Sequence, residues 1–220
     1  MLVTKIISIA SLFFQLINGD VVNLNIPCHN EKVCPKLTYD TTKGIPDSTT
    51  YRASLIINPN QNVKNIYAVF GSDEGTMYLP PSYNEIGYNN MGKPIGGIYE
   101  VFIDQIPELL FDSWLTIGIT DGDINHQLSY VGIDFDSWTY KNALTINNGA
   151  VFLLNPEEIT CQDECLIGQF TISDDISTNI IINVQGRKIN EDPLNMNDNA
   201  WTEYNIVFPI NSKTGPHQST

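Results

Sequence analysis

Short runs in which apolar and polar residues alternate recur along most of this chain, and a period of two is typical of β-strands. The first run covers residues 21–26, where Val, Leu and Ile occupy every second position. Gly, Pro and Asn separate the runs, as expected for turns, and residues 28–50 are predicted to form a loop. Further strands are predicted at residues 51–57, 63–70, 76–79, 98–103, 150–154, 166–172, 178–185 and 203–208.

Apolar stripes with the helical period of 3.6 residues are almost absent from the chain. Helical turns are predicted only at residues 105–110 and 139–144. The pattern therefore predicts an all-β protein, a single β-sandwich or jelly-roll-like domain with short helical turns. We expect this domain to cover residues 20–210 and residues 211–220 to form a disordered polar tail.

One tetrapeptide, Phe-Asp-Ser-Trp, occurs twice, at residues 111–114 and 135–138. Alternating runs at residues 115–119 and 130–135 surround an Asp-Gly-Asp segment between the two copies, and a hairpin is the simplest structure for them. That hairpin would place Trp114 and Trp138 at the same end of a sheet. The tryptophans could serve as exposed platforms for a ligand, but we favour packing at the rim of the core, because Trp is mostly buried in soluble domains.

The loop between the two tetrapeptides is the best candidate for a metal site. Asp121, Asp123 and Asn125 provide oxygen atoms at alternate positions, which is how calcium-binding loops begin. The match to an EF-hand is incomplete, because His126 occupies the position of the sixth-place Gly and Gly132 that of the twelfth-place Glu. The alternative is that Asp-Gly forms a turn and that the acidic side chains face water.

Several tyrosines lie near one irregular segment of the chain. Tyr78, Tyr83 and Tyr88 are candidate stacking platforms for a carbohydrate ligand, although tyrosines also pack loops onto cores. The sequence Pro-Pro-Ser-Tyr at residues 80–83 matches the PPxY ligand of WW domains. Because those domains are cytosolic, we interpret the two prolines as stiffening a loop.

The N-terminal residues predict entry into the secretory pathway. Lys5 precedes an apolar run at residues 6–14 that is shorter than a membrane-spanning helix, which needs about 20 residues. Residues 1–19 are therefore predicted to be a signal peptide, with an uncleaved signal anchor as the alternative. We expect no membrane insertion after cleavage, and a location that is extracellular, at a cell surface or at a virion surface.

The four cysteines lie in two close pairs, Cys28 with Cys34 and Cys161 with Cys165. Four cysteines allow three sets of disulfides, and we favour local pairing within each pair. A zinc site formed by all four thiolates is the alternative. Neither spacing is the usual C-x2-C, and an oxidising compartment favours disulfides over zinc.

The overall charge narrows the classes of partner. The chain has 11 Lys and Arg against 25 Asp and Glu, and its formal net charge is -14. Such a surface repels nucleic acids and anionic lipids, so cations, glycans or other extracellular and surface proteins are the expected partners. Solubility alone would also account for the acidic charge.

No arrangement of residues indicates a catalytic mechanism. His29, His126 and His217 are not accompanied by a G-x-S-x-G motif, and no glycine-rich phosphate loop is present. A glycosidase needs only two carboxylates in a cleft, and 25 acidic residues leave that option open. We therefore assign no catalytic residue and favour a function other than catalysis.

Five segments, at residues 67–71, 79–83, 112–118, 132–134 and 148–152, resemble an extracellular module of unassigned activity found in secreted proteins of protists, algae and marine bacteria. The resemblance covers about residues 65–208. It implies a secreted β-rich domain and transfers no catalytic residue. Taken together, these features predict a secreted binding or surface-structural module, which calcium would stabilise if the acidic loop binds it. The alternative is an extracellular carbohydrate-active hydrolase with paired carboxylates.

Overall fold

The computed structural model describes residues 20–41, 44–84, 94–157, 161–189 and 199–212. The predicted signal peptide and residues 213–220 of the predicted tail lie outside these ranges. The strands are β1 (Val21–Leu24), β2 (Val33–Asp40), β3 (Ser48–Ile57), β4 (Val63–Gly71), β5 (Met77–Leu79), β6 (Trp114–Leu115), β7 (Leu128–Val131), β8 (Leu144–Ile146), β9 (Gly149–Leu153), β10 (Glu164–Ser173), β11 (Thr178–Lys188) and β12 (Ala200–Ile210). The helices are α2 (Glu100–Ile103) and the 3-10 turns η1 (Pro107–Phe111) and η2 (Phe135–Ser137).

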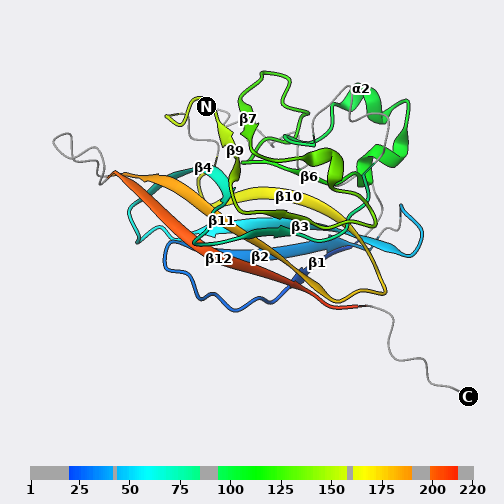
Figure 1. Ribbon diagram of the computed structural model, residues 1–220, viewed down its shortest axis with the longest axis horizontal. Helices are drawn as coiled ribbons and strands as arrows, with labels where there is room; N and C mark the ends of the chain where they lie inside the picture. The colour runs from blue at the N-terminus through cyan, green and yellow to red at the C-terminus, as the bar shows by residue number, and fades with distance from the viewer. Residues whose placement is uncertain (1–19, 42–43, 85–93, 158–160, 190–198, 213–220) are drawn as a thin grey trace, which may run out of the picture.

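These strands form two antiparallel sheets that pack against each other, which confirms the predicted all-β sandwich with short helical turns (Figure 1). The first sheet has the order β1-β2-β3-β10-β6. The second has the order β7-β9-β4-β11-β5-β8, and β12 pairs with β11 along its other edge. Each sheet joins strands that are distant in the sequence, so the loops between them cross from one sheet to the other.

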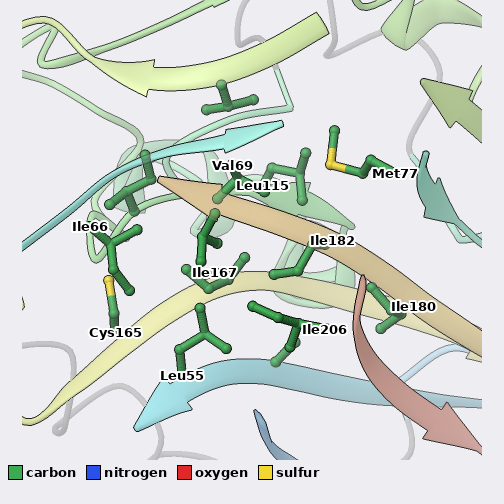
Figure 2. Packing of buried hydrophobic residues seen from close by; sticks show 14 of the residues in the cluster. Leu55, Ile66, Val69, Met77, Leu115, Cys165, Ile167, Ile180, Ile182 and Ile206 are labelled. Atoms are coloured by element: carbon green, nitrogen blue, oxygen red, sulfur yellow. The ribbon is translucent and has the colours of Figure 1, made fainter. Parts of the chain in front are cut away.

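The core lies between the sheets and is built from the alternate apolar positions of their strands. Leu55 and Ile167 of the first sheet lie among Ile66, Ile182 and Ile206 of the second, and all five are buried (Figure 2). Burying one such side chain contributes about 1.5–3 kcal/mol relative to leaving it exposed. The period of two in the sequence therefore predicts which residues stabilise the sandwich.

The predicted loop at residues 28–50 is wrong in part, because β2 and the start of β3 lie within it. Val33, Pro35 and Leu37 alternate and point into the core, but Pro35 makes the run look like a turn. The proline is tolerated because β1 pairs only with residues 37–40 of β2, so at Pro35 the strand has a single neighbour.

Two predictions of local structure are also wrong. Residues 98–103 were expected to be a strand, but α2 forms there through bonds from Asp104 N to Glu100 O and from Ile106 N to Phe102 O. A strand needs a neighbouring strand to satisfy its backbone, and this segment makes local bonds instead. The predicted helical turn at 139–144 is replaced by a turn between Thr139 and Asn142 followed by β8, whereas the turn at 105–110 corresponds to η1.

The predicted hairpin around the acidic loop does not form. β6 pairs with β10 in the first sheet, whereas β7 pairs with β9 in the second. Beyond β6 the chain still follows β10, because Thr116 N donates to Ile167 O and Gly118 N donates to Leu166 O. The chain then turns away, because Gly118 adopts a φ of 75° and the Thr116 hydroxyl accepts a bond from Ile119 N. The acidic loop therefore connects the two sheets rather than two paired strands.

Both disulfides have the local pairing that the sequence favoured, Cys28–Cys34 and Cys161–Cys165. Cys161 and Cys165 are buried in the core, whereas Cys28 is exposed. Two disulfides agree with an oxidising compartment. Among the described residues, no helix has the length and apolar character that a membrane crossing requires.

Tyr51 provides a test of the buried interior at alkaline pH. Burial raises the pKa of Tyr51 to about 12, and the nearby Asp174 carboxylate adds to the effect. Because the folded pKa lies above the ordinary 10.0, stability from the neutral phenol is complete below pH 10 and is lost as the pH rises through about 12. We expect the free energy of unfolding of the wild type to fall across this interval. The free energy of unfolding of Tyr51→Phe should fall less steeply. Identical slopes in urea titrations at these pH values would contradict the assignment.

Candidate binding surface

The acidic loop is organised by one of its own carboxylates. Asp123 is buried and adopts a φ of 51°, and its Oδ1 and Oδ2 accept bonds from Gln127 N at 2.7 Å and Leu128 N at 3.0 Å. Its carbonyl oxygen accepts a third bond from His126 N at 2.9 Å. The side chain thus caps the backbone that leads into β7, as Asp side chains often do in turns.

The other predicted calcium ligands lie differently. Asp121 and Asn125 are both exposed, and the backbone of Asp121 forms a bridge with Gly97. Within the described part of the chain, no group of three or more His, Cys, Asp and Glu side chains is close enough to hold a metal ion. The structure thus gives Asp123 a structural role, and calcium binding by the loop stays a prediction.

Replacing Asp123 and Asp121 in turn separates these two roles. We expect Asp123→Ala to lower the free energy of unfolding by about 1–3 kcal/mol, because the N–H group of buried Leu128 loses its partner. Asp121→Ala should change the stability by less than about 0.5 kcal/mol, as is usual for exposed positions. Thermal melts of both variants with calcium and with EDTA are the measurement. A rise in melting temperature with calcium that Asp121→Ala abolishes would support the calcium hypothesis.

The two Phe-Asp-Ser-Trp copies converge on the segment at residues 80–84. Trp138 Nε1 donates to Pro80 O at 2.8 Å, and Ser113 N donates to Tyr83 O at 3.0 Å. Trp114 and Trp138 are 3% and 1% exposed, so both are packed into the protein. The copies hold the core together, as the packing interpretation predicts.

The three tyrosines proposed for stacking do not all lie in described parts of the structure. Tyr78 is a half-buried residue of β5, beside Thr145 of β8. Tyr83 is also half-buried, and its backbone N–H donates to Thr171 O. Tyr88 lies outside the described residues. Carbohydrate stacking by the three rings therefore remains a prediction.

The outer face of β10 anchors the segment that precedes β6. Gln169 Nε2 donates to Leu110 O and Asp112 O, both at 2.8 Å, and Gln169 Oε1 accepts a bond from Arg52 Nε. Thr171 N donates to Ser113 Oγ at 3.0 Å. Polar side chains in an otherwise apolar strand were the signal for this anchor, and the sequence prediction missed it.

At Gly96 and Gly97 the chain that leads to α2 lies against the acidic loop. Gly96 and Gly97 have φ values of 81° and 88°, a region that favours glycine. A Cβ on Gly97 would lie 2.4 Å from Thr120 O, and one on Gly122 would lie 2.6 Å from Tyr99 N. The chain thus leaves the sandwich beside the acidic loop and continues directly into α2.

Helix α2 projects from this base and buries none of its four residues. Tyr99 and Val101 are 43% and 47% exposed, and Tyr99 packs edge to face on Phe102 with ring centroids 5.8 Å apart. Figure 1 shows α2 on the far side of the β6 layer from β12. We call the exposed residues Tyr99, Glu100, Val101, Asp104 and Glu108 the α2 surface.

The charge around α2 is of one sign along a long stretch of sequence. Residues 94–140 contain no Lys or Arg, although the whole chain has 11. The absence of basic residues from this stretch was the signal that could have located the α2 surface. The same stretch contains eight acidic residues: Glu100, Asp104, Glu108, Asp112, Asp121, Asp123, Asp134 and Asp136.

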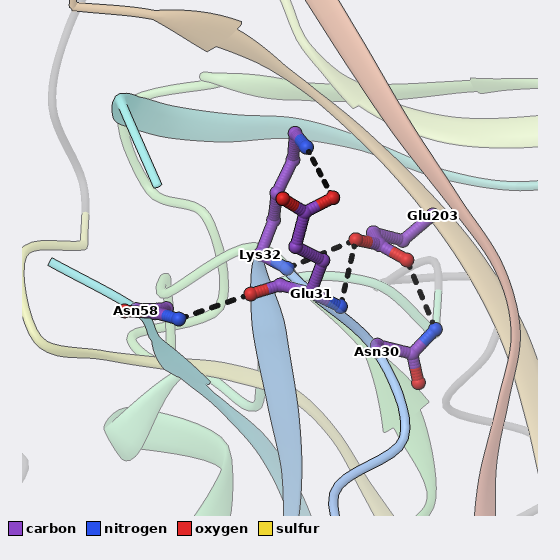
Figure 3. A network of polar contacts seen from close by, with 5 residues as sticks. All are labelled: Asn30, Glu31, Lys32, Asn58 and Glu203. Carbon is purple, nitrogen blue, oxygen red and sulfur yellow. Dashed lines mark hydrogen bonds and ion pairs between the residues drawn. The ribbon is translucent and has the colours of Figure 1, made fainter. Parts of the chain in front are cut away.

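A second polar site joins the two sheets at the loop of the exposed disulfide. Glu203 of β12 accepts bonds from Asn30 Nδ2 at 3.0 Å, Glu31 N at 3.2 Å and Lys32 N at 2.9 Å (Figure 3). Asn58, just after β3, donates its Nδ2 to Glu31 O and its N to Lys32 O. The carboxylate thus fastens the loop that leads into β2 onto β12, and its role is structural.

We expect Glu203→Ala to destabilise the protein by about 1–2 kcal/mol, because two backbone N–H groups lose a charged acceptor in a half-buried setting. Glu31→Ala is the matched control, since among the described residues its exposed carboxylate pairs only with Lys32, across 3.5 Å. Its effect should stay within about 0.5 kcal/mol. Urea unfolding of both variants is the measurement. Equal losses of unfolding free energy would show that the hydrogen bonds accepted by Glu203 add no specific stability.

Comparisons of the chain with protein families, with curated proteins and with solved structures gave no significant match. The resemblance to the secreted module therefore stays a prediction, and the function is argued from the geometry alone.

Proposed function

We propose that this protein is a secreted binding module that presents the α2 surface to an extracellular partner. One observation carries the proposal: a helix with no buried residue projects from a well-anchored base and presents two exposed apolar side chains, Val101 and the Tyr99 that precedes it. Exposed large apolar residues cost solubility, and grouped on one element they are typical of interaction sites. The two disulfides agree with an extracellular setting.

The base of α2 supports a binding role because it fixes the helix without covering it. Gln169 and Thr171 hold the following segment on β10, and Gly97 holds the preceding segment on the acidic loop. A surface element that is positioned in advance loses less conformational entropy when a partner binds. The arrangement therefore favours recognition over a purely structural role for this part of the chain.

Binding of the wild type and of two matched double variants to arrays tests the proposal. One array carries glycans, and the other carries synthetic peptides that vary in charge and hydrophobicity. We expect wild type to bind one class of probe, and Tyr99→Ser with Val101→Ser to weaken that binding by about tenfold or more. Leu154→Ser with Ile189→Ser replaces two apolar side chains elsewhere that are even more exposed, and should leave binding unchanged.

Two outcomes would overturn the proposal. Wild type that binds no probe, or equal binding by both variants, would remove the α2 surface from consideration. A polysaccharide hydrolysis screen covers the alternative function: release of reducing ends by wild type, abolished by one carboxylate substitution, would establish the hydrolase.

A further inference from the structure

We infer that the α2 surface binds a basic polypeptide segment in which Lys or Arg residues are interspersed with apolar ones. This inference rests on the proposed function and adds the chemistry of the partner. Three features of the α2 surface support it: the acidic side chains, their lack of partners among the described residues, and the apolar side chains between them.

The acidic side chains of the α2 surface have no partner among the described residues. Glu100, Asp104 and Glu108 are all exposed, and none of the three carboxylates has a hydrogen bond or ion pair to another described residue. Elsewhere in the described chain Lys36 pairs with Glu164, and Lys64 with Glu157. Residues 94–140 contain no Lys or Arg, so the carboxylates of the α2 surface favour a partner that carries positive charge.

Apolar side chains lie among these carboxylates. Tyr99 precedes Glu100 and Val101 follows it, and both side chains are more than two-fifths exposed. Covering them contributes hydrophobic free energy, and the Tyr99 ring can also receive a Lys or Arg side chain through a cation–π contact. A partner that satisfies both features must carry positive charge and apolar groups together.

Other classes of partner satisfy only one feature. Nucleic acids are repelled by the carboxylates, a neutral glycan leaves those charges uncompensated, and a metal ion leaves Tyr99 and Val101 exposed. A basic amphipathic polypeptide supplies Lys or Arg for the carboxylates and apolar side chains for the helix. Charge complementarity of this kind raises the association rate and makes binding dependent on salt.

Three synthetic peptides of equal length test the chemistry: one alternating Lys with Leu, one with every Lys replaced by Gln, and one with every Leu replaced by Ser. Fluorescence anisotropy against the full chain at about 50 mM and 300 mM NaCl gives Kd for each. We expect the Lys-Leu peptide to bind at least about tenfold more tightly than either of the others, and to weaken at the higher salt concentration.

Two triple variants with the same change of net charge test the location. We expect Glu100→Gln with Asp104→Asn and Glu108→Gln to weaken the Lys-Leu peptide by about tenfold or more. The matched control neutralises three exposed acids outside residues 94–140, as Asp20→Asn with Asp73→Asn and Asp163→Asn, and should change Kd by less than about twofold. Circular dichroism and melting temperature confirm that both variants fold.

The outcomes separate this inference from the proposed function. Equal loss in both triple variants would mean that only net charge matters and would overturn the inference. Equal binding of the Lys-Leu and Gln peptides, or no peptide binding, would also overturn the inference. The proposed function would still stand if binding to the arrays depends on Tyr99 and Val101. If no probe depends on Tyr99 and Val101, the proposed function fails as well.

Discussion

Trp138→Ala is expected to lower the free energy of unfolding by about 3–5 kcal/mol, the usual cost of removing a buried Trp side chain. The side chain is 1% exposed, its ring packs on Phe170 with centroids 5.9 Å apart, and its Nε1 donates to Pro80 O at 2.8 Å. The substitution therefore leaves a cavity where residues 80–84 join β10, and among the described residues Pro80 O keeps only the bond from Ser82 Oγ. Urea unfolding followed by far-ultraviolet circular dichroism measures the loss.

Trp138→Phe and Tyr99→Ala act as controls for this prediction. The Phe variant keeps most of the apolar contacts but loses the bond to Pro80 O, and should cost about 1–2 kcal/mol. Tyr99→Ala removes an exposed ring of the α2 surface and should cost less than about 1 kcal/mol. If Trp138→Ala were no more destabilising than Tyr99→Ala, the packing interpretation of the second Phe-Asp-Ser-Trp copy would be wrong.

The alternation of apolar and polar residues predicted the sandwich, but it did not predict which strands pair with each other. A run such as 178–185 identifies a buried strand because Ile180, Ile182 and Val184 share a face, and β11 confirms it. The hairpin around the acidic loop failed because pairing depends on long-range contacts. Leu115 finds its partner at Gly168, far along the chain, rather than in the run beyond the loop.

The candidate sites show a similar division. Local features predicted the disulfides, since each cysteine pair is close in sequence and pairs locally. The α2 surface was missed because the alternation of Ile98, Glu100 and Phe102 indicated a strand. Exposure is a tertiary property, and whether a neighbouring strand covers a short apolar run cannot be deduced from the run itself. The charge pattern of residues 94–140 was available, but it indicates a surface only once α2 is seen to project from the fold.

The buried amide of Asn183 connects three segments of the second sheet. Asn183 of β11 lies opposite a bulge in β12 and is 0% exposed. Its Nδ2 donates to Phe70 O at 2.9 Å and also to Gly75 O, and its Oδ1 accepts a bond from Asn205 N at 2.9 Å. Asn205 has a φ of 53°, so the bulge in β12 also depends on this contact. A single side chain thus bonds to the backbone of three separate segments.

Asn183→Leu is therefore expected to destabilise the protein by about 2–4 kcal/mol, although it replaces the amide with an apolar group of similar size. The substitution removes three hydrogen bonds, each contributing about 0.5–1.5 kcal/mol, and Asn205 N loses its bond to Oδ1, whereas Gly75 O keeps the bond from Ser72 N. Asn179→Leu, an exposed position on the same strand, is the control and should stay within about 0.5 kcal/mol. Similar urea midpoints for the two variants would contradict the prediction. They would mean that water or a shift of the backbone replaces the hydrogen bonds of Asn183.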